Sequence, residues 1–152
     1  MKIGLISDTH GLLRPQALAA LQGCDQLIHA GDIGKPQILD ALREIAPLTV
    51  VRGNNDMADA WAEHVPLEAL LRVGDVGIYV THIPADVPEI LPPGVQVVVV
   101  GHSHKPLIEQ RHGVLFINPG SAGPRRFKLP VSVAVLTVDG GGVVGELVGL
   151  EV

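Results

Sequence analysis

The chain has 152 residues, a formal net charge of −5, 47% hydrophobic residues and only 3% aromatic residues. This hydrophobic fraction excludes an intrinsically disordered protein, and the length is typical of one domain, which we expect to span residues 1–152. The negative charge and the few aromatic side chains argue against stable nucleic-acid binding, and no apolar run reaches the ~20 residues of a membrane span.

The first third of the chain alternates apolar runs with helix-like segments. We predict strands at 2–7, 26–30 and 48–52, and helices at 14–23 and 35–45. Pro15 and Pro36 stand near the starts of the two helices, where the missing N–H of proline costs nothing. This β-α-β-α-β order predicts a parallel sheet with right-handed crossovers.

The remainder of the chain, from about residue 65, is rich in strands separated by glycine-containing turns. We predict strands at 68–73, 77–82, 95–100, 107–112, 114–118, 131–138 and 143–152. The short turns indicate a largely antiparallel arrangement. Together the two parts predict an α/β protein in which two sheets share one core and the helices lie outside. The acidic Asp8 comes too early for a signal-peptide core, so a cytoplasmic protein with no membrane partner is expected.

Five of the predicted strands end in side chains that can bind a metal. These endings are Asp8-Thr9-His10, Gly31-Asp32, Gly53-Asn54-Asn55-Asp56, Thr81-His82 and Gly101-His102-Ser103-His104. Open α/β sheets place their ligand sites at the carboxyl ends of the strands. The pattern therefore predicts one shared crevice that collects these side chains.

The spacing within two of the endings suggests chelation. Asp8 and His10 are two positions apart, as are His102 and His104. Residues i and i+2 of an extended backbone point to the same side, so each pair could bind one ion if the backbone stays extended there. Carboxylate and imidazole ligands suit Mn, Fe, Zn or Ni better than Ca or Mg.

Each ending taken alone has a simpler interpretation. Asp8 could cap the helix that follows it. The Gly31-Asp32 and Gly53–Asp56 segments could be ordinary turns, and His82 could be a structural histidine. Five such endings after five strands favour the shared site. Three further histidines do not follow the pattern and are expected to be structural or solvated: His29, His64 and His112.

The ordered motifs "DTH", "GD", "GNND", "TH" and "GHSH" resemble those of the calcineurin-like metallophosphoesterase superfamily. The segment "NPGS" at 118–121 resembles an additional motif of its compact bacterial and archaeal phosphodiesterase branch. The resemblance extends from Asp8 to about Arg125. It implies a four-layer sandwich of two mixed β-sheets flanked by helices, with a two-metal site at the C-terminal ends of the strands.

The resemblance also implies a role for each ligand. One metal would be held by Asp8, His10, Asp32 and His104. The other would be held by Asp32, Asn54, His82 and His102, so that Asp32 bridges. Such a centre hydrolyses phosphoesters, here most simply phosphodiesters, by attack of a hydroxide that bridges the two ions. Mn is the favoured metal, with Fe, Ni or Zn as alternatives.

Two positions depart from the family pattern. Many larger members carry a histidine, resembling a general acid, where this chain has Asn55, and an amide cannot donate a proton at useful cost near pH 7. Good leaving groups should therefore be favoured. Ile83 stands where many relatives have a glycine after the histidine, and Ile83 and Pro84 together make the loop after His82 stiffer. Arg125 could reach an outer phosphate oxygen or be a solvated surface residue.

The sequence is also compatible with two other functions. The superfamily includes a vesicle-sorting subunit that resembles a degenerate member, so a non-catalytic interaction module of the same fold is one alternative. A metal-binding regulator is another. All seven ligand positions are filled here, which favours a phosphoesterase acting on a small substrate. A homo-oligomer is compatible with the sequence.

Overall fold

The computed structural model describes residues 1–140 and 142–152. Within them, two α-helices and ten strands follow one another in the chain with three short 3₁₀ turns. Their bounds are β1 Lys2–Ile6, α1 Pro15–Leu21, β2 Gln26–His29, α2 Pro36–Arg43, β3 Leu48–Val50, β4 Glu68–Val73, β5 Val76–Thr81, β6 Val95–Val99, β7 Leu107–Arg111, β8 Val114–Asn118, β9 Ser132–Asp139 and β10 Gly142–Gly149. The 3₁₀ turns are Asn54–Asp56, Ala60–Ala62 and Pro84–Asp86.

The first sheet has the strand order β10-β9-β1-β2-β3. β1, β2 and β3 pair in parallel, whereas β9 pairs antiparallel with both β1 and β10. The predicted β-α-β-α-β opening is confirmed, and both helices begin at their proline. Among the described residues, no helix has the length and apolar character that crossing a membrane requires.

The second sheet has the order β4-β5-β6-β8-β7 and is less antiparallel than its turns suggest. β4 with β5 and β7 with β8 form antiparallel hairpins, but β5, β6 and β8 are parallel to one another. A parallel connection needs about a dozen residues or more, and the segment 82–94 between β5 and β6 supplies that length. Consequently the carboxyl ends of β5 and β6 lie at the same edge of the sheet.

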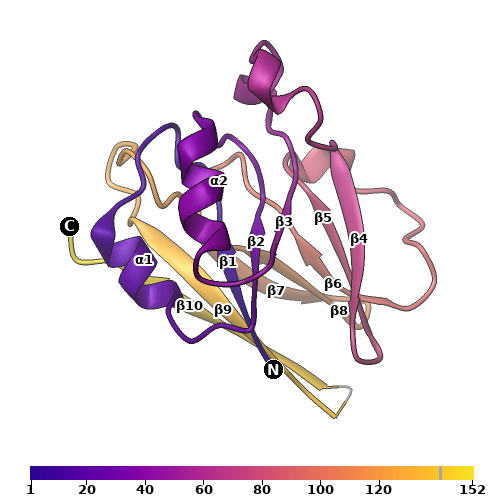
Figure 1. Cartoon of the computed structure of the whole chain (residues 1–152). Helices are drawn as coiled ribbons and strands as arrows, with labels where there is room; N and C mark the ends of the chain where they lie inside the picture. Colours follow the sequence, from indigo (N-terminus) through magenta and orange to yellow (C-terminus); the bar gives the residue numbers. More distant parts are fainter. Residues whose placement is uncertain (141) are drawn as a thin grey trace.

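The two sheets pack face to face and share one apolar core. It contains side chains from both sheets, such as Ile3 and Leu5 of β1 and Ile78 and Val97 of the second sheet. Alternate residues of β1 face the other way, where Ile6 packs with α1 and α2 in a second cluster. Figure 1 shows both helices over the same face of the first sheet.

The outer face of the second sheet is covered by chain without an α-helix in the described residues. Tyr79 and Val98 point outward there and pack against Val87 and Leu91 of the segment between β5 and β6. This segment contains the 3₁₀ turn Pro84–Asp86. The molecule is therefore an α/β sandwich of two mixed sheets whose outermost layers are two helices on one side and a short irregular segment on the other (Figure 1).

Candidate metal centre

The carboxyl ends of five strands meet where the two sheets adjoin, and the seven predicted ligands lie there. The first sheet supplies Asp8, His10, Asp32 and Asn54, and the second supplies His82, His102 and His104. Backbone hydrogen bonds hold the loops together: Asp8 donates its N–H to Gly31 and His10 donates to Asp32. Residues distant in sequence are thereby fixed in one place.

Asp8, His10 and His104 form the first of two groups whose potential ligand atoms lie within 4.8 Å of one another. The Nε2 atoms of His10 and His104 are 3.2 Å apart. Asp8 Oδ1 lies 3.3 Å from His104 Nε2 and 3.8 Å from His10 Nε2. The three side chains thus direct donor atoms at one point.

Asp32, His82 and His102 form the second group. Asp32 Oδ2 lies 3.2 Å from His82 Nε2. The exposed Asn54 adjoins this group, because its Oδ1 lies 3.1 Å from His102 Nδ1. The group therefore offers one carboxylate, two imidazoles and one amide oxygen. Transition metals accept ligands of all three types.

Asp32 lies between the two groups. Its Oδ2 is 3.2 Å from His82 Nε2 in the second group and 3.6 Å from His10 Nε2 in the first. Its other oxygen accepts the backbone N–H of Asn55 at 2.9 Å. This position is the one that a bridging carboxylate requires.

The hydrogen bonding of the buried atoms fits a bound cation. Asp8 Oδ1 and His82 Nε2 are buried, and neither has a hydrogen-bond partner in the described residues. His82 Nδ1 lies 2.7 Å from the carbonyl oxygen of Ala30, so this nitrogen carries the proton and Nε2 presents its lone pair to Asp32. Unpaired buried acceptors that converge are costly unless a cation or a proton lies between them.

The pKa shifts in the metal-free protein agree with this arrangement. Burial alone would lower the pKa of His82, but the carboxylates of Asp32 and Asp8 outweigh it and raise that pKa. Burial would raise the pKa of Asp32, but His82, the Asn55 N–H and His10 lower it. The carboxylates that favour protonation of His82 are the same groups that would favour a metal, so a proton and a metal would compete for these atoms.

The backbone at these residues is not extended, so the condition set for chelation by residues two positions apart is not met. Asp8, His10, His102 and His104 all have positive φ, between 45° and 72°. The chain turns sharply there, so side chains two positions apart need not share a direction. Asp8 and His10 still belong to one group, but His102 and His104 point to different groups and do not form a chelating pair.

Glycines allow these turns to pack closely. A Cβ atom at Gly31, whose φ is +105°, would lie 2.6 Å from His82 Nδ1. A Cβ atom at Gly53 would collide with Asp32. Any other residue at these two positions would push a candidate ligand away from the centre.

Asp56 is a residue whose importance the sequence did not reveal. Its buried carboxylate accepts the backbone N–H groups of Ile33, Gly34 and Gly53 at 3.0–3.2 Å. It therefore ties the loop that carries Asp32 to the loop that carries Asn54. An acidic residue three positions after a turn glycine could have suggested this capping role.

Asp8 is oriented by further polar groups. Its Oδ2 accepts the hydroxyl of Ser7 at 2.7 Å and the backbone N–H of His102 at 3.1 Å, which leaves Oδ1 free. Ser121, in the "NPGS" segment, donates its hydroxyl to the carbonyl of Asp8. Asn118 from the same segment donates to the carbonyl of Gly101. The "NPGS" segment thus holds the loops that carry Asp8 and His102 in place through these hydrogen bonds.

His29 is structural, as predicted, and links two of the loops. Gly31 donates its N–H to His29 Nδ1, so Nε2 carries the proton and donates to Thr9, whose hydroxyl donates to Ile33. Burial lowers the pKa of His29 to about 4, so it is neutral at pH 7. The predictions for His64 and His112 also hold, since both are exposed.

The remaining predictions have mixed outcomes. Asp8 is no helix cap, because α1 begins at Pro15 with Arg14 as its N-cap. Asn55 adjoins the centre, with Nδ2 3.3 Å from Asp32 Oδ2. Arg125 is exposed on the loop before β9, with no hydrogen bond or ion pair to the described residues, and its role stays a prediction.

Comparison with known proteins places the chain among phosphoesterases. Residues 1–141 match a family model for the calcineurin-like phosphoesterase superfamily domain. A probable metallophosphoesterase of Methanocaldococcus jannaschii is 33% identical over 153 residues, which cover 91% of this chain and 77% of that protein. The phosphodiesterase YfcE of Escherichia coli is 31% identical over 163 residues, which cover 91% and 89%.

Solved structures have the same fold. The structure of E. coli YfcE superposes with a TM-score of 0.72 at 27% identity and covers 99% of this chain and 100% of that one. Vps29 from Chaetomium thermophilum superposes with a TM-score of 0.75 at 22% identity and covers 99% and 96%. The second likeness concerns the fold alone.

Proposed function

The chain belongs to the calcineurin-like phosphoesterase superfamily, and we propose that it hydrolyses phosphodiesters with two divalent metal ions. The observation that carries this proposal is the pair of ligand groups with Asp32 between them. Two of the unpaired buried atoms, Asp8 Oδ1 and His82 Nε2, lie at this site and also support it. Manganese is the favoured metal, and iron, nickel and zinc are alternatives that such ligands also accept.

The candidate ligands would be divided between the two metal ions. Asp8, His10 and His104 would hold one ion, and Asn54, His82 and His102 the other, with Asp32 shared. Two ions so held would lower the pKa of water and offset the charge of the phosphoryl oxygens. Ser7 and Ala30 fix the orientation of two of these ligands through hydrogen bonds, so the donor atoms need not reorganise.

Preference for diesters is supported by the E. coli relative YfcE, which is named a phosphodiesterase. Asn55 concerns the leaving group instead: it supplies no proton, which favours esters whose alcohol departs without one.

A non-catalytic interaction module is the alternative, and the similarity in fold to Vps29 is the observation that favours it. A degenerate member is expected to lack ligands, whereas this chain has a side chain suited to metal binding at each of the seven positions. A protein-binding role would also leave the buried unpaired atoms without a purpose. We therefore prefer the enzyme. Cytoplasmic location and oligomeric state stay predictions.

The test measures metal content and turnover together. The metal-free protein would be reloaded with Mn, Fe(II), Ni or Zn and assayed on bis(p-nitrophenyl) phosphate and on p-nitrophenyl phosphate. We expect about two ions per chain and faster turnover of the diester. Asp32→Asn should lower metal content and reduce kcat by more than the ~10–100-fold typical of an outer-sphere partner.

Asp40→Asn is the matched control, because Asp40 is exposed on α2 and paired only with Arg43. Two ions bound and most activity retained in Asp32→Asn would exclude the bridging role. No turnover of either ester with any metal would favour the interaction module.

A further inference from the structure

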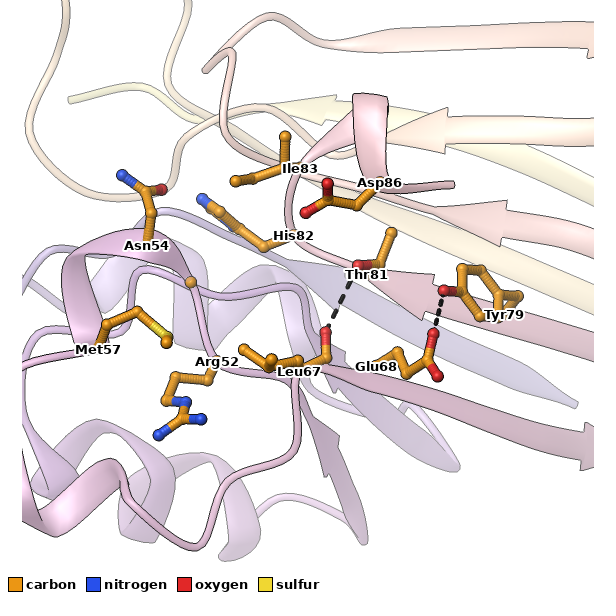
Figure 2. Close-up of a pocket in the computed structure, with 11 residues that line it drawn as sticks. Arg52, Asn54, Met57, Leu67, Glu68, Tyr79, Thr81, His82, Ile83 and Asp86 are labelled. Carbon is orange, nitrogen blue, oxygen red and sulfur yellow. Dashed lines mark hydrogen bonds between the residues drawn. The ribbon is translucent and has the colours of Figure 1, made fainter. Parts of the chain in front are cut away.

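A pocket of about 470 Å³ opens beside the second ligand group. His82 and Asn54 line one end of it, so the pocket adjoins the place where the phosphoryl group would be bound (Figure 2). His82 is 3% exposed, and its Nε2 has no hydrogen-bond partner in the described residues. The volume lies in the range of about 300–1,000 Å³ that small-molecule sites occupy.

The wall of the pocket is partly apolar. Met57, Leu67 and Ile83 contribute aliphatic surface, and Tyr79 contributes an aromatic ring. Leu67 and Met57 are half exposed, so their aliphatic surface is open to a ligand in the pocket. None of these four residues belongs to the candidate ligand set. We therefore expect them to contact the organic part of the substrate and not the metal ions.

The pocket is lined by more negatively charged side chains than positively charged ones. Glu68 and Asp86 lie on one side and Arg52 on the other, as Figure 2 shows. None of the three forms an ion pair with any described residue within 4.0 Å, and Arg52 Nε is buried without a hydrogen-bond partner. Two carboxylates against one guanidinium give this pocket a net negative charge.

The hydroxyl donors of the pocket are already engaged. Tyr79 donates its hydroxyl to Glu68, and Thr81 donates to the carbonyl of Leu67 (Figure 2). Burial, together with the neighbouring Glu68, raises the pKa of Tyr79 to about 12, so the phenol stays neutral. A ligand therefore meets carboxylate acceptors rather than free hydroxyl donors at this side of the pocket.

We propose that this pocket binds one organic group of a phosphodiester and that Asp86, assisted by Glu68, selects for a group that carries a positive charge, such as a quaternary or primary ammonium. This inference rests on the proposed function. An alkylammonium suits the pocket because its carbon surface would contact the apolar wall and its charge would face the carboxylates.

Arg52 opposes this preference and so offers a second test of it. Its guanidinium lies across the pocket from Asp86 in Figure 2. Removing its charge in Arg52→Gln should strengthen the preference for a cationic group. Removing a carboxylate in Asp86→Asn should weaken the same preference.

The experiment compares two diesters of equal shape and equal leaving group. One is p-nitrophenyl phosphorylcholine, and the other is 3,3-dimethylbutyl p-nitrophenyl phosphate, in which carbon replaces the charged nitrogen. Each kcat/KM is divided by the uncatalysed rate of the same ester, and the ratio of the two corrected values measures charge selection alone. Asp75→Asn is the matched control, because Asp75 is exposed in the turn between β4 and β5.

We expect the choline ester to be preferred by the unmodified protein. The preference should fall by about threefold to fivefold in Asp86→Asn, the size of one partly exposed ion pair. It should rise in Arg52→Gln and stay unchanged in Asp75→Asn. An equal ratio in the unmodified protein and in Asp86→Asn would overturn the inference. If the diesters and bis(p-nitrophenyl) phosphate are all untouched, the proposed function itself is wrong.

Discussion

Asn55 is the residue that most directly limits the chemistry of the candidate centre. Its side-chain amide lies 3.3 Å from Asp32 Oδ2 and 3.4 Å from His10 Nδ1, and the residue is exposed. It can therefore hydrogen-bond at the rim of the centre but cannot transfer a proton near pH 7. Departure of the alcohol then depends on the stability of its own oxyanion.

We expect a steep dependence of kcat/KM on the leaving-group pKa of substituted diesters. Asn55→His should flatten that dependence and raise turnover of poor leaving groups, since positioned proton donation contributes about 10²–10⁴-fold. A series of substituted esters, measured at one fixed metal, tests this. Asn55→Ala is the control, because it removes the amide without adding an acid. A shallow slope in the unmodified protein would mean that another group already donates the proton.

The backbone of the ligands is the part of the site that residue types do not predict. Five of the seven candidate ligands have positive φ: Asp8, His10, Asp32, His102 and His104. Such conformations are strained for non-glycine residues and persist where the surrounding structure imposes them. The identity of the ligands was predictable from motif order, but their directions depend on hydrogen bonds across loops that no local pattern encodes.

The loops at the strand ends are held to one another rather than to their own strands. Asp56 joins the loop after β2 to the loop after β3, because its carboxylate accepts three backbone N–H groups from the two segments. Asp32 and Asn54 lie on these two loops. A change at Asp56 should therefore affect metal binding although Asp56 itself is not a candidate ligand.

Asp56→Asn turns one acceptor oxygen into an NH₂ group that faces backbone donors. We expect a loss of about 1–3 kcal/mol in the free energy of unfolding of the metal-free protein. Metal affinity should also fall, by roughly 10-fold or more. Calorimetric melting and metal titration measure the two effects. Asp59→Asn is the control, since Asp59 caps the next 3₁₀ turn without a side-chain hydrogen bond. Unchanged affinity with lowered stability would limit Asp56 to a structural role.

Strand direction also required the structure. Periodicity predicted where the strands lie, but the glycine turns suggested a largely antiparallel second half, whereas β5, β6 and β8 are parallel. The 13 residues at 82–94 between β5 and β6 read equally well as a loop or a crossover. This correction matters for function, because only a parallel pair brings His82 and His102 to the same edge.

The whole molecule is built around the core between the two sheets. Side chains of β1, β5, β6 and β9 fill it together, so neither sheet has a complete apolar interior alone. The expectation of one domain over residues 1–152 stays a prediction, and this shared core says how to test it. One domain would appear as a single cooperative transition, seen at the same denaturant concentration by all probes.

His29 should make this stability sensitive to acid. It is fully buried with a pKa of about 4, whereas its pKa in the unfolded chain is about 6.5. The unfolded state therefore binds the proton first, and stability falls as pH decreases from about 6.5 to about 4, by roughly 1.4 kcal/mol per unit. Above pH 6.5 this contribution is complete.

Urea unfolding of the metal-free protein at pH 7 and pH 5 tests the effect. His29→Gln should reduce the loss between these two values by about 2 kcal/mol relative to the unmodified protein. Other groups titrate equally in both proteins, so the difference isolates His29. An equal pH dependence in the two proteins would contradict a buried neutral imidazole.

Both ligand groups draw side chains from both sheets. Asp8 and His10 of the first sheet meet His104 of the second, and Asp32 meets His82 and His102 in the same way. An ion held by either group would link the two sheets to each other and would bind only the folded state. Loss of that ion would remove a link between the two layers at this edge, so the metal-free protein should unfold at a lower denaturant concentration than the metal-loaded protein.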